Sequence, residues 1–511
     1  MQFLHSKSKK LAAVISYFYL GLNALISIFL TPIILNYLGV DEYGLYQMVY
    51  SVGHYILILD LGIGMVMIRY ISEYRTKNDR KGEENFSAMI GIITIVLSII
   101  VFIIGIIVDA NIENIFTRLT VDEYAKSHTM FYLMILQFIF TIVDHYFQGI
   151  ICAYEHFSFT KIIGICKLIF VFFSTILFLK FGWGAVGIVA ANTVACCIFT
   201  IIDMLYTFKT LKVRICYYHW DRIILKPAIG LMLAMLLQSV VGHVNSSVDK
   251  TILGIMCTQA DVTVYSVAAT IITLFNTIPT VISGLFQPQV TRMVVHKASN
   301  KELTDLVIRV GRWQFLLCGT FLAGMILFGI YFLQLWIGAK LTDEQISFCW
   351  IIMLLILPFN MIPLIQTVCI SILNAYDKRM DRSLILTGMC VVNILVSILF
   401  VNAFGPIGCP LGTAFSYLIG YAFILNIYYN KRLKLDVVRM FKEIFRRIWL
   451  CLLVTTLITL LLLLINHNSM FYILVSIIFF FCSLCFFMYK YGFNREEKDI
   501  CLQLVRKIHL K

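Results

Sequence analysis

The chain has 511 residues, of which 60% are hydrophobic and only 14% are charged, and its formal net charge is +13. Soluble domains contain about 25% charged and about 45–50% apolar residues, so this composition excludes an ordinary soluble protein. It indicates an all-α integral membrane protein, because a helix in lipid satisfies its own backbone hydrogen bonds.

Fourteen apolar segments follow one another along the chain, most of them near the ~20 residues that cross ~30 Å of hydrocarbon. In chain order they are predicted at 11–35, 44–68, 86–108, 127–150, 160–180, 185–208, 227–256, 263–286, 312–336, 347–372, 384–404, 411–430, 446–466 and 470–490. The first follows several lysines, as a secretory signal does, but its apolar run is too long, so an uncleaved helix is expected. Apolar residues at helical spacing in 287–312 predict amphipathic segments lying on the cytoplasmic leaflet.

The basic residues predict the orientation of the chain. If the N-terminus is cytoplasmic, 35 of the 41 lysines and arginines fall in inside segments, four in outside loops and two within spans. Because cytoplasmic loops are enriched in basic residues, both termini are expected in the cytoplasm. The positive charge is then an orientation signal that also suits anionic headgroups, and nucleic-acid binding is excluded.

Neither the cysteines nor the glycines indicate a cofactor. The fifteen cysteines are scattered, without a disulfide framework or zinc spacing, and are expected to pack as small apolar side chains. Gly182-x-Gly184-x-x-Gly187 has the spacing of a dinucleotide fingerprint but joins two hydrophobic segments with no strand before it, so it predicts a tight helical turn. With no P-loop motif either, no cofactor is expected, and the chain is not expected to be an enzyme.

A weak repeat runs through the chain. A shift of 222 positions places Tyr43 on Tyr265 and residues 153–155 on 375–377, and one position away Gly184 falls on Gly405. The alternative is that apolar sequences match one another by chance, but these matches occur in order and at equivalent places in the predicted topology.

Such a repeat is typical of transporter folds, and six helices per copy make the two copies parallel. The sequence therefore predicts two parallel six-helix lobes around a central cavity, residues 1–215 and 216–435. Transmembrane helices 13 and 14 and a cytoplasmic tail follow in 436–511.

Several stretches carry a family resemblance: LTPIILNYLGVDEYGLY at 30–46, LDLGIG at 59–64, RYISEYR at 69–75, DKTILG at 249–254 and VYSVA at 264–268. They resemble the polysaccharide transporter family, the Wzx-type flippases of the multidrug/oligosaccharidyl-lipid/polysaccharide exporter superfamily. The resemblance implies a bacterial inner-membrane flippase for an undecaprenyl-pyrophosphate-linked oligosaccharide repeat unit. The repeat unit would be destined for O-antigen of lipopolysaccharide, capsule or exopolysaccharide, and a monomer in contact with the polysaccharide polymerase machinery is expected.

Two other functions stay open. A cation-coupled multidrug exporter belongs to the same superfamily and shares its pattern. A membrane polysaccharide polymerase, from a different class, fits the hydrophobicity, but such enzymes need a sizeable extramembrane loop. The longest outside loop here is 109–126, which argues against catalysis.

Charged residues within the spans are the candidate substrate contacts, because a charge at the bilayer centre costs about 2.5–3.5 kcal/mol. Lys167 either attracts the pyrophosphate and the sugars or snorkels to the interface. Asp249 and Lys250 in the seventh span point about 100° apart and need not pair with each other; either they bind substrate or both lie at the interface. Arg69 and Arg292 end spans on the cytoplasmic side, where they either bind phosphate oxygens or anchor the helix ends.

Asp60 and Asp144 are the candidate ion-coupling residues. A buried carboxylate can carry a proton or help to hold a sodium ion. Gly62 and Gly64 allow close backbone approach or local bending beside Asp60, whose alternative role is to pair with Arg69 or another cation. Three histidines within the spans either pack through hydrogen bonds or take part in coupling: His54, His145 and His243.

Overall fold

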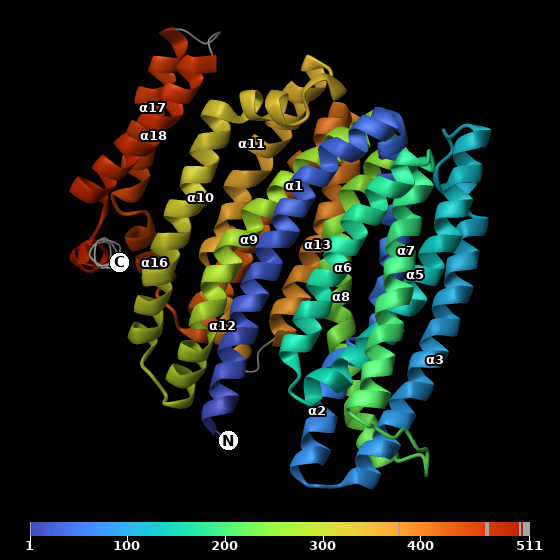
Figure 1. Ribbon diagram of the computed structural model, residues 1–511. Helices are drawn as coiled ribbons and strands as arrows, with labels where there is room; N and C mark the ends of the chain where they lie inside the picture. The colour runs from blue at the N-terminus through green and yellow to red at the C-terminus, as the bar shows by residue number, and fades with distance from the viewer. Residues whose placement is uncertain (1, 377–378, 466–469, 500–501, 504–511) are drawn as a thin grey trace. The chain divides into compact units, whose positions relative to one another are not determined.

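The computed structural model describes residues 2–376, 379–465, 470–499 and 502–503 (Figure 1), and every regular element in these ranges is a helix. The first half contains α1 (Gln2–His54), η1 (Tyr55–Asp60), α2 (Ile63–Thr76), α3 (Arg80–Ala110), α4 (Ile112–Ile115), α5 (Val121–Ala153), α6 (Phe157–Lys180), α7 (Gly184–Leu205), η2 (Tyr206–Thr210) and α8 (Arg222–Met256). The second half contains α9 (Gln259–Val295), α10 (Asn300–Trp336), η3 (Gly338–Lys340), α11 (Asp343–Ile365), α12 (Thr367–Ala375), α13 (Arg379–Phe404), η4 (Gly405–Ile407), α14 (Gly408–Tyr417), η5 (Leu418–Ile424), α15 (Leu425–Leu433), α16 (Val437–Phe445), α17 (Ile448–Ile465), α18 (Met470–Phe487) and η6 (Met488–Gly492).

The helices account for the predicted membrane spans. Twelve helical stretches within the described ranges are long and apolar enough to cross a membrane. Two of them, Ile15–Thr76 and Met380–Leu433, are 62 and 54 residues long, more than twice the ~20 residues needed for one crossing, and each contains two predicted spans. The predicted all-α membrane fold with about fourteen crossings is confirmed.

The second predicted span is broken near its middle. Gly39 (φ 73°, ψ −175°) first bends α1, and after η1 both Leu61 (φ 53°) and Gly62 (φ 64°) adopt left-handed backbone before α2 begins. A Cβ at Gly62 would lie 2.8 Å from the Cβ of Met235 on α8, so glycine serves both the conformation and the packing. The break places Asp60 at the end of η1.

Residues 287–312 form the ends of two long helices. α9 continues to Val295 and α10 begins at Asn300, with only a short turn between them. Val290 and Leu303 are fully buried. The helical spacing was correctly identified, but the prediction that this apolar face lies on the leaflet is wrong at these positions, because they are buried inside the protein.

A buried arginine fastens α10 to the end of the chain. The Arg312 guanidinium, 3% exposed, donates to the carboxylate oxygens of Glu497 at 2.6 and 3.0 Å. It also donates to the carbonyls of Glu443 on α16 at 2.7 Å and of Gly492 at 2.9 Å. We call these four residues the Arg312 clamp; such planar, forked recognition is specific to arginine.

Contacts divide the chain into two compact units. Unit 1 comprises the chain up to Thr270 with Ile337–Gln345 and Met380–Ser416, and unit 2 comprises Ile271–Trp336, Ile346–Arg379 and the chain from Tyr417 onward. These units reflect contacts alone, so the two six-helix lobes at 1–215 and 216–435 and the separate segment 436–511 stay a prediction.

Positions matched by the predicted repeat share local structure. Ala153 ends α5 and Ala375 ends α12. Gly184 and Gly405, with φ of 53° and 70°, each stand where one helix gives way to the next. Residue 377, also part of the match, lies outside the described residues.

Candidate functional site

The candidate site lies in unit 1, where α5 packs against α2, α3 and α7, and α6 packs against α1 and α7; Figure 1 shows α5, α6 and α7 side by side. Glycines let α2 and α5 approach closely. A Cβ on Gly64 would lie 3.2 Å from the carbonyl oxygen of His145, and one on Gly149 would lie 2.9 Å from the carbonyl oxygen of Gly64. This close packing brings His145 to the break that holds Asp60.

A row of polar and aromatic side chains joins α1 to α8. We call it the polar face, and its members are Tyr46, Gln47, Tyr50, His54, His243 and Lys250. Ring centroids follow one another at 5.6 Å from Tyr46 to Tyr50, 5.4 Å to His54 and 4.6 Å to His243. The Nδ1 atoms of the two histidines are 3.1 Å apart. The ammonium of half-buried Lys250 donates to the amide oxygen of Gln47 at 2.9 Å, so the predicted cation stands at one end of the face.

Asp249 and Lys250 bond to different partners, as their angular separation on α8 predicts. The Asp249 carboxylate is buried and accepts hydrogen bonds at Oδ2 from the hydroxyls of Tyr265 and Thr413, the latter at 2.7 Å. Asp249 therefore faces α9 and α14, while Lys250 faces α1. The other carboxylate oxygen of Asp249 has no hydrogen-bond partner among the described residues.

A second group of charges is buried between α5, α6 and α7. We call it the acid cluster, and its members are Asp144, Gln148, Lys167 and Asp203. Asp144 Oδ2 accepts from the Gln148 amide at 3.0 Å and lies 3.5 Å from the Lys167 ammonium. Asp203, 0% exposed, interacts with both Asp144 and Gln148. Lys167 is thus paired inside unit 1, with its side chain 27% exposed.

The Asp60–His145 pair stands beside this cluster. The Asp60 carboxylate lies 2.9 Å from Nδ1 of His145, so this histidine is the side chain that pairs with Asp60. His145 follows Asp144 on α5 and interacts with both Asp144 and Lys167, and Asp60 also interacts with His243. Titratable groups therefore connect the polar face to the acid cluster.

The two predicted cytoplasmic arginines are exposed. Arg69 on α2 lies 5.8 Å from the ring centroid of Tyr70. Arg292 on α9, in unit 2, lines two open depressions, one with Gln287 and Thr291 and the other with His296. Each is accessible to an anion, and each also fits an anchor at a helix end.

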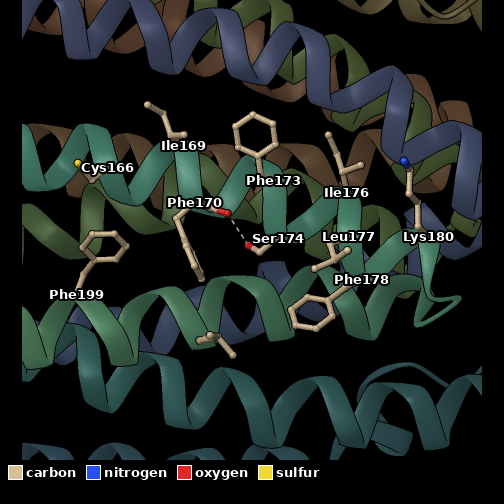
Figure 2. A pocket seen from close by; sticks show the side chains of 11 residues that line it. Cys166, Ile169, Phe170, Phe173, Ser174, Ile176, Leu177, Phe178, Lys180 and Phe199 are labelled. Atoms are coloured by element: carbon tan, nitrogen blue, oxygen red, sulfur yellow. Dashed lines mark hydrogen bonds between the residues drawn. The ribbon is translucent and has the colours of Figure 1, made fainter.

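An apolar groove of about 870 Å³ runs along α6 and α7 (Figure 2). Its lining is Cys166, Ile169, Phe170, Phe173, Ser174, Ile176, Leu177, Phe178, Lys180, Val194 and Phe199. The Ser174 hydroxyl donates to the carbonyl of Phe170 at 2.7 Å. Because this polar group is already bonded within its own helix, the walls of the groove suit hydrocarbon. Cys166 lines this groove while the next residue, Lys167, bonds to Asp144; α6 thus has one apolar and one polar side.

Sequence reasoning missed Asp203, Gln148 and the tyrosines of the polar face. Asp203 falls within the predicted sixth span, so the rule that selected Asp144 applied to it equally. Tyr46, Tyr50 and His54 are spaced four residues apart, which places them on one side of a helix. Among the described residues, no group of three or more His, Cys, Asp and Glu side chains is arranged to hold a metal ion.

A many-helix membrane bundle with charge pairs buried inside its spans defines the class of polytopic transporter-like proteins. The sequence matches the family "Polysaccharide biosynthesis protein" over residues 11–294, more than half of the chain, and the protein belongs to this family. No curated protein matches the sequence.

Solved structures show the same fold at low sequence identity. The lipid II flippase MurJ in an inward closed conformation is 14% identical with a TM-score of 0.71, covering 93% of this chain and 97% of that one. An inward-facing multidrug resistance MATE transporter of the MOP superfamily is 13% identical with a TM-score of 0.66, covering 84% and 99%. The MATE multidrug transporter DinF-BH is 16% identical with a TM-score of 0.62, covering 84% and 96%.

Proposed function

We propose that this protein is a flippase that moves an undecaprenyl-pyrophosphate-linked oligosaccharide repeat unit from the cytoplasmic to the periplasmic leaflet of a bacterial inner membrane. The repeat unit serves O-antigen, capsule or exopolysaccharide synthesis. The observation that carries the proposal is membership in a family of polysaccharide biosynthesis proteins. The fold shared with a flippase named for lipid II supports it.

The polar face has the chemistry that a pyrophosphate-linked sugar needs. The Lys250 ammonium supplies positive charge for the pyrophosphate, and its present partner, Gln47, is a neutral amide that an anion can replace. Tyrosine rings offer flat apolar surfaces with hydroxyl groups at their edges, and the histidines add further hydrogen-bonding groups. Arg69 and Arg292 are assigned to the first capture of the headgroup at the cytoplasmic surface.

Two of the predicted substrate residues are placed differently in this scheme. Lys167 pairs with Asp144 and Asp249 bonds to two hydroxyls, so we assign both to support of the transport path. Asp60 and Asp144 are assigned to ion coupling, because the sequence has no P-loop for ATP. The rival energy source is consumption of the cargo by polymerisation on the far side.

The proposed orientation has both termini in the cytoplasm. Cysteines introduced singly near Asn114 and Lys340 in a cysteine-free background should react with an impermeant maleimide added outside. Cysteines near Asp79 and Ser299 should react only after the membrane is permeabilised. Outside labelling at either of these two positions contradicts the orientation, because one missed span inverts everything after it. A monomer working beside the polymerase machinery completes the proposal.

Deletion of the gene tests the function. Lipid-linked repeat units should accumulate and surface polysaccharide should disappear, and expression of the intact protein should reverse both effects. The second candidate is a cation-coupled multidrug exporter, favoured by the fold shared with the MATE transporter. A deletion strain with normal surface glycan and increased sensitivity to cationic drugs would establish this exporter and reject the flippase.

A further inference from the structure

The carboxyl group of Asp203 is the least satisfied charged side chain in the described part of unit 1. Asp203 is 0% exposed, and neither carboxylate oxygen has a hydrogen-bond partner among the described residues. Oδ1 of Asp144, which is 3% exposed, has no partner there either. Buried polar groups are almost always bonded, so these orphaned oxygens indicate that the site binds something further.

The charge of the acid cluster points the same way. With Lys167 protonated and both carboxyls ionised, the cluster carries one net negative charge inside the membrane-spanning bundle. An unpaired buried charge costs several kcal/mol, and two carboxylates that face each other cannot both stay ionised cheaply. A single proton placed on one carboxyl neutralises the cluster and supplies the O–H donor that the other carboxyl lacks.

Among the described residues, no cation is hydrogen-bonded to the Asp203 carboxyl. The titratable groups outside the cluster that interact with it are Cys152 and His145 on α5 and Cys196 on α7, and Asp60 on η1 interacts with His145. His145 is occupied by Asp60 at 2.9 Å, and the cysteines add no positive charge. The Asp60–His145 pair is more exposed than the Asp144 carboxyl, with side-chain exposures of 20% and 42% against 4%, so it is the more accessible titratable pair beside the two carboxyls.

We propose that Asp144 and Asp203, beside Lys167, share one exchangeable proton that enters and leaves past His145 and Asp60. Binding forms an O–H bond on one carboxyl with a proton taken from water, and release returns it to water. The use of this proton to drive transport rests on the proposed flippase function; the binding itself does not. In that cycle the protonated cluster is neutral. The deprotonated cluster carries one negative charge, which a proton driven by the proton gradient then neutralises.

Infrared difference spectroscopy on the purified protein tests proton binding without any cargo. Between about pH 5 and about pH 9, the wild type should show the carbonyl stretching band of a buried protonated carboxyl, shifted in heavy water and lost at high pH. The band should disappear in Asp203→Asn and in Asp144→Asn. It should persist in the matched control Asp109→Asn, which alters a buried carboxyl that already pairs with His128 at 2.8 Å. A wild type without a titrating band, or a band that persists in both cluster variants, overturns the proposal.

Two further experiments identify the bound ion and test its link to transport. Exchanging choline for sodium at constant pH should leave the band unchanged; loss of the band in sodium would mean that the site binds a metal cation and would overturn the proton assignment. In liposomes, an imposed proton gradient should accelerate flipping by the wild type, and the ratio of rates with and without the gradient should fall to about one in Asp203→Asn. A titrating band in a protein that flips no lipid-linked saccharide would reject the flippase and keep the site.

Discussion

Two buried charge groups in this protein are built in opposite ways. In the Arg312 clamp, a single guanidinium donates to both oxygens of Glu497 and to two backbone carbonyls, all within 3.0 Å. In the acid cluster, the one ammonium lies 3.5 Å from the Asp144 carboxyl, and three of the four carboxylate oxygens have no partner among the described residues. The first group is complete, while the second is short of one positive charge.

The difference distinguishes a charge group that stabilises the fold from one that can bind and release a cation. A buried ion pair whose hydrogen bonds are all made resists change, because removing either partner leaves a charge stranded. A buried carboxylate whose oxygens have no hydrogen-bond partner is destabilised by its lost hydration. Binding of a small cation removes this destabilisation. We therefore assign the Arg312 clamp to the stability of unit 2 and the acid cluster to function.

The largest loss of stability is expected from Arg312→Ala. The substitution strands the Glu497 carboxylate in a buried site, and the free energy of unfolding should fall by about 3–5 kcal/mol. The apparent melting temperature of the purified protein in detergent measures the loss. Arg309→Ala is the control, because Arg309 forms an exposed pair with Glu496 at 3.7 Å that is worth less than about 1 kcal/mol. Equal melting temperatures for these two variants would show that the Arg312 clamp does not stabilise unit 2.

Lys167→Met should have an intermediate effect. Methionine keeps the apolar stem but removes the only cation of the acid cluster, and the carboxyls can limit the damage by taking up protons. We expect a loss of about 1–3 kcal/mol, larger at high pH, where protons are scarce. The double variant Lys167→Met with Asp144→Asn should recover most of the loss, since it leaves a single carboxyl. A double variant no more stable than Lys167→Met contradicts the charge balance described above.

Asp203→Asn should change stability least among the buried substitutions. It leaves the neutral Lys167–Asp144 pair, so the free energy of unfolding should change by less than about 1 kcal/mol. The melting temperature should stay near that of the wild type or rise. Glu497→Gln in the clamp is the matched comparison and should cost about 1.5–3 kcal/mol, because it weakens hydrogen bonds to a charged group. The comparison between the groups fails if Asp203→Asn proves the more damaging of the two.

Lys250→Ala and Arg69→Ala should leave stability almost unchanged and still lower the amount of surface polysaccharide at normal protein level. Both residues are assigned to the anionic headgroup, and neither is fully buried. Lys250→Arg should retain more polysaccharide than Lys250→Ala, because it keeps the charge. Glycan staining of complemented deletion cells measures the effect, and normal glycan in both alanine variants would exclude these residues from the transport path.

Much of the fold was predictable because the membrane makes hydrophobic length a strong signal. The span that holds Asp60 shows the limit. The glycines beside Asp60 suggested a bend, but the left-handed backbone at Leu61 and Gly62 follows from close packing against α8, which no local pattern reveals. The end of α9 was misjudged for the same reason, since an amphipathic stretch has one sequence signature whether a leaflet or a protein covers it.

The candidate site was predictable as separate residues and not as groups. Asp144 and Lys167 were selected as charges within spans, but their pairing needs α5 and α6 to lie side by side, and Asp203 joins them only through α7. Arg312 was counted among the inside charges, and its role depends on Glu497, 185 residues further along the chain. Long-range pairing of this kind is set by helix packing, which composition and periodicity do not predict.

Transport of a lipid-linked saccharide by the purified protein tests the central claim most directly. The protein is reconstituted in liposomes with undecaprenyl-pyrophosphate-linked oligosaccharide, and a saccharide-modifying enzyme added outside reports the headgroups that reach the outer leaflet. Lys250→Ala, which should keep the melting temperature of the wild type, is the variant that lacks the proposed headgroup contact. We predict that wild-type liposomes expose the inner-leaflet headgroups far faster than protein-free liposomes and that Lys250→Ala slows this exposure. Exposure no faster than in protein-free liposomes, from correctly folded protein, would contradict the account.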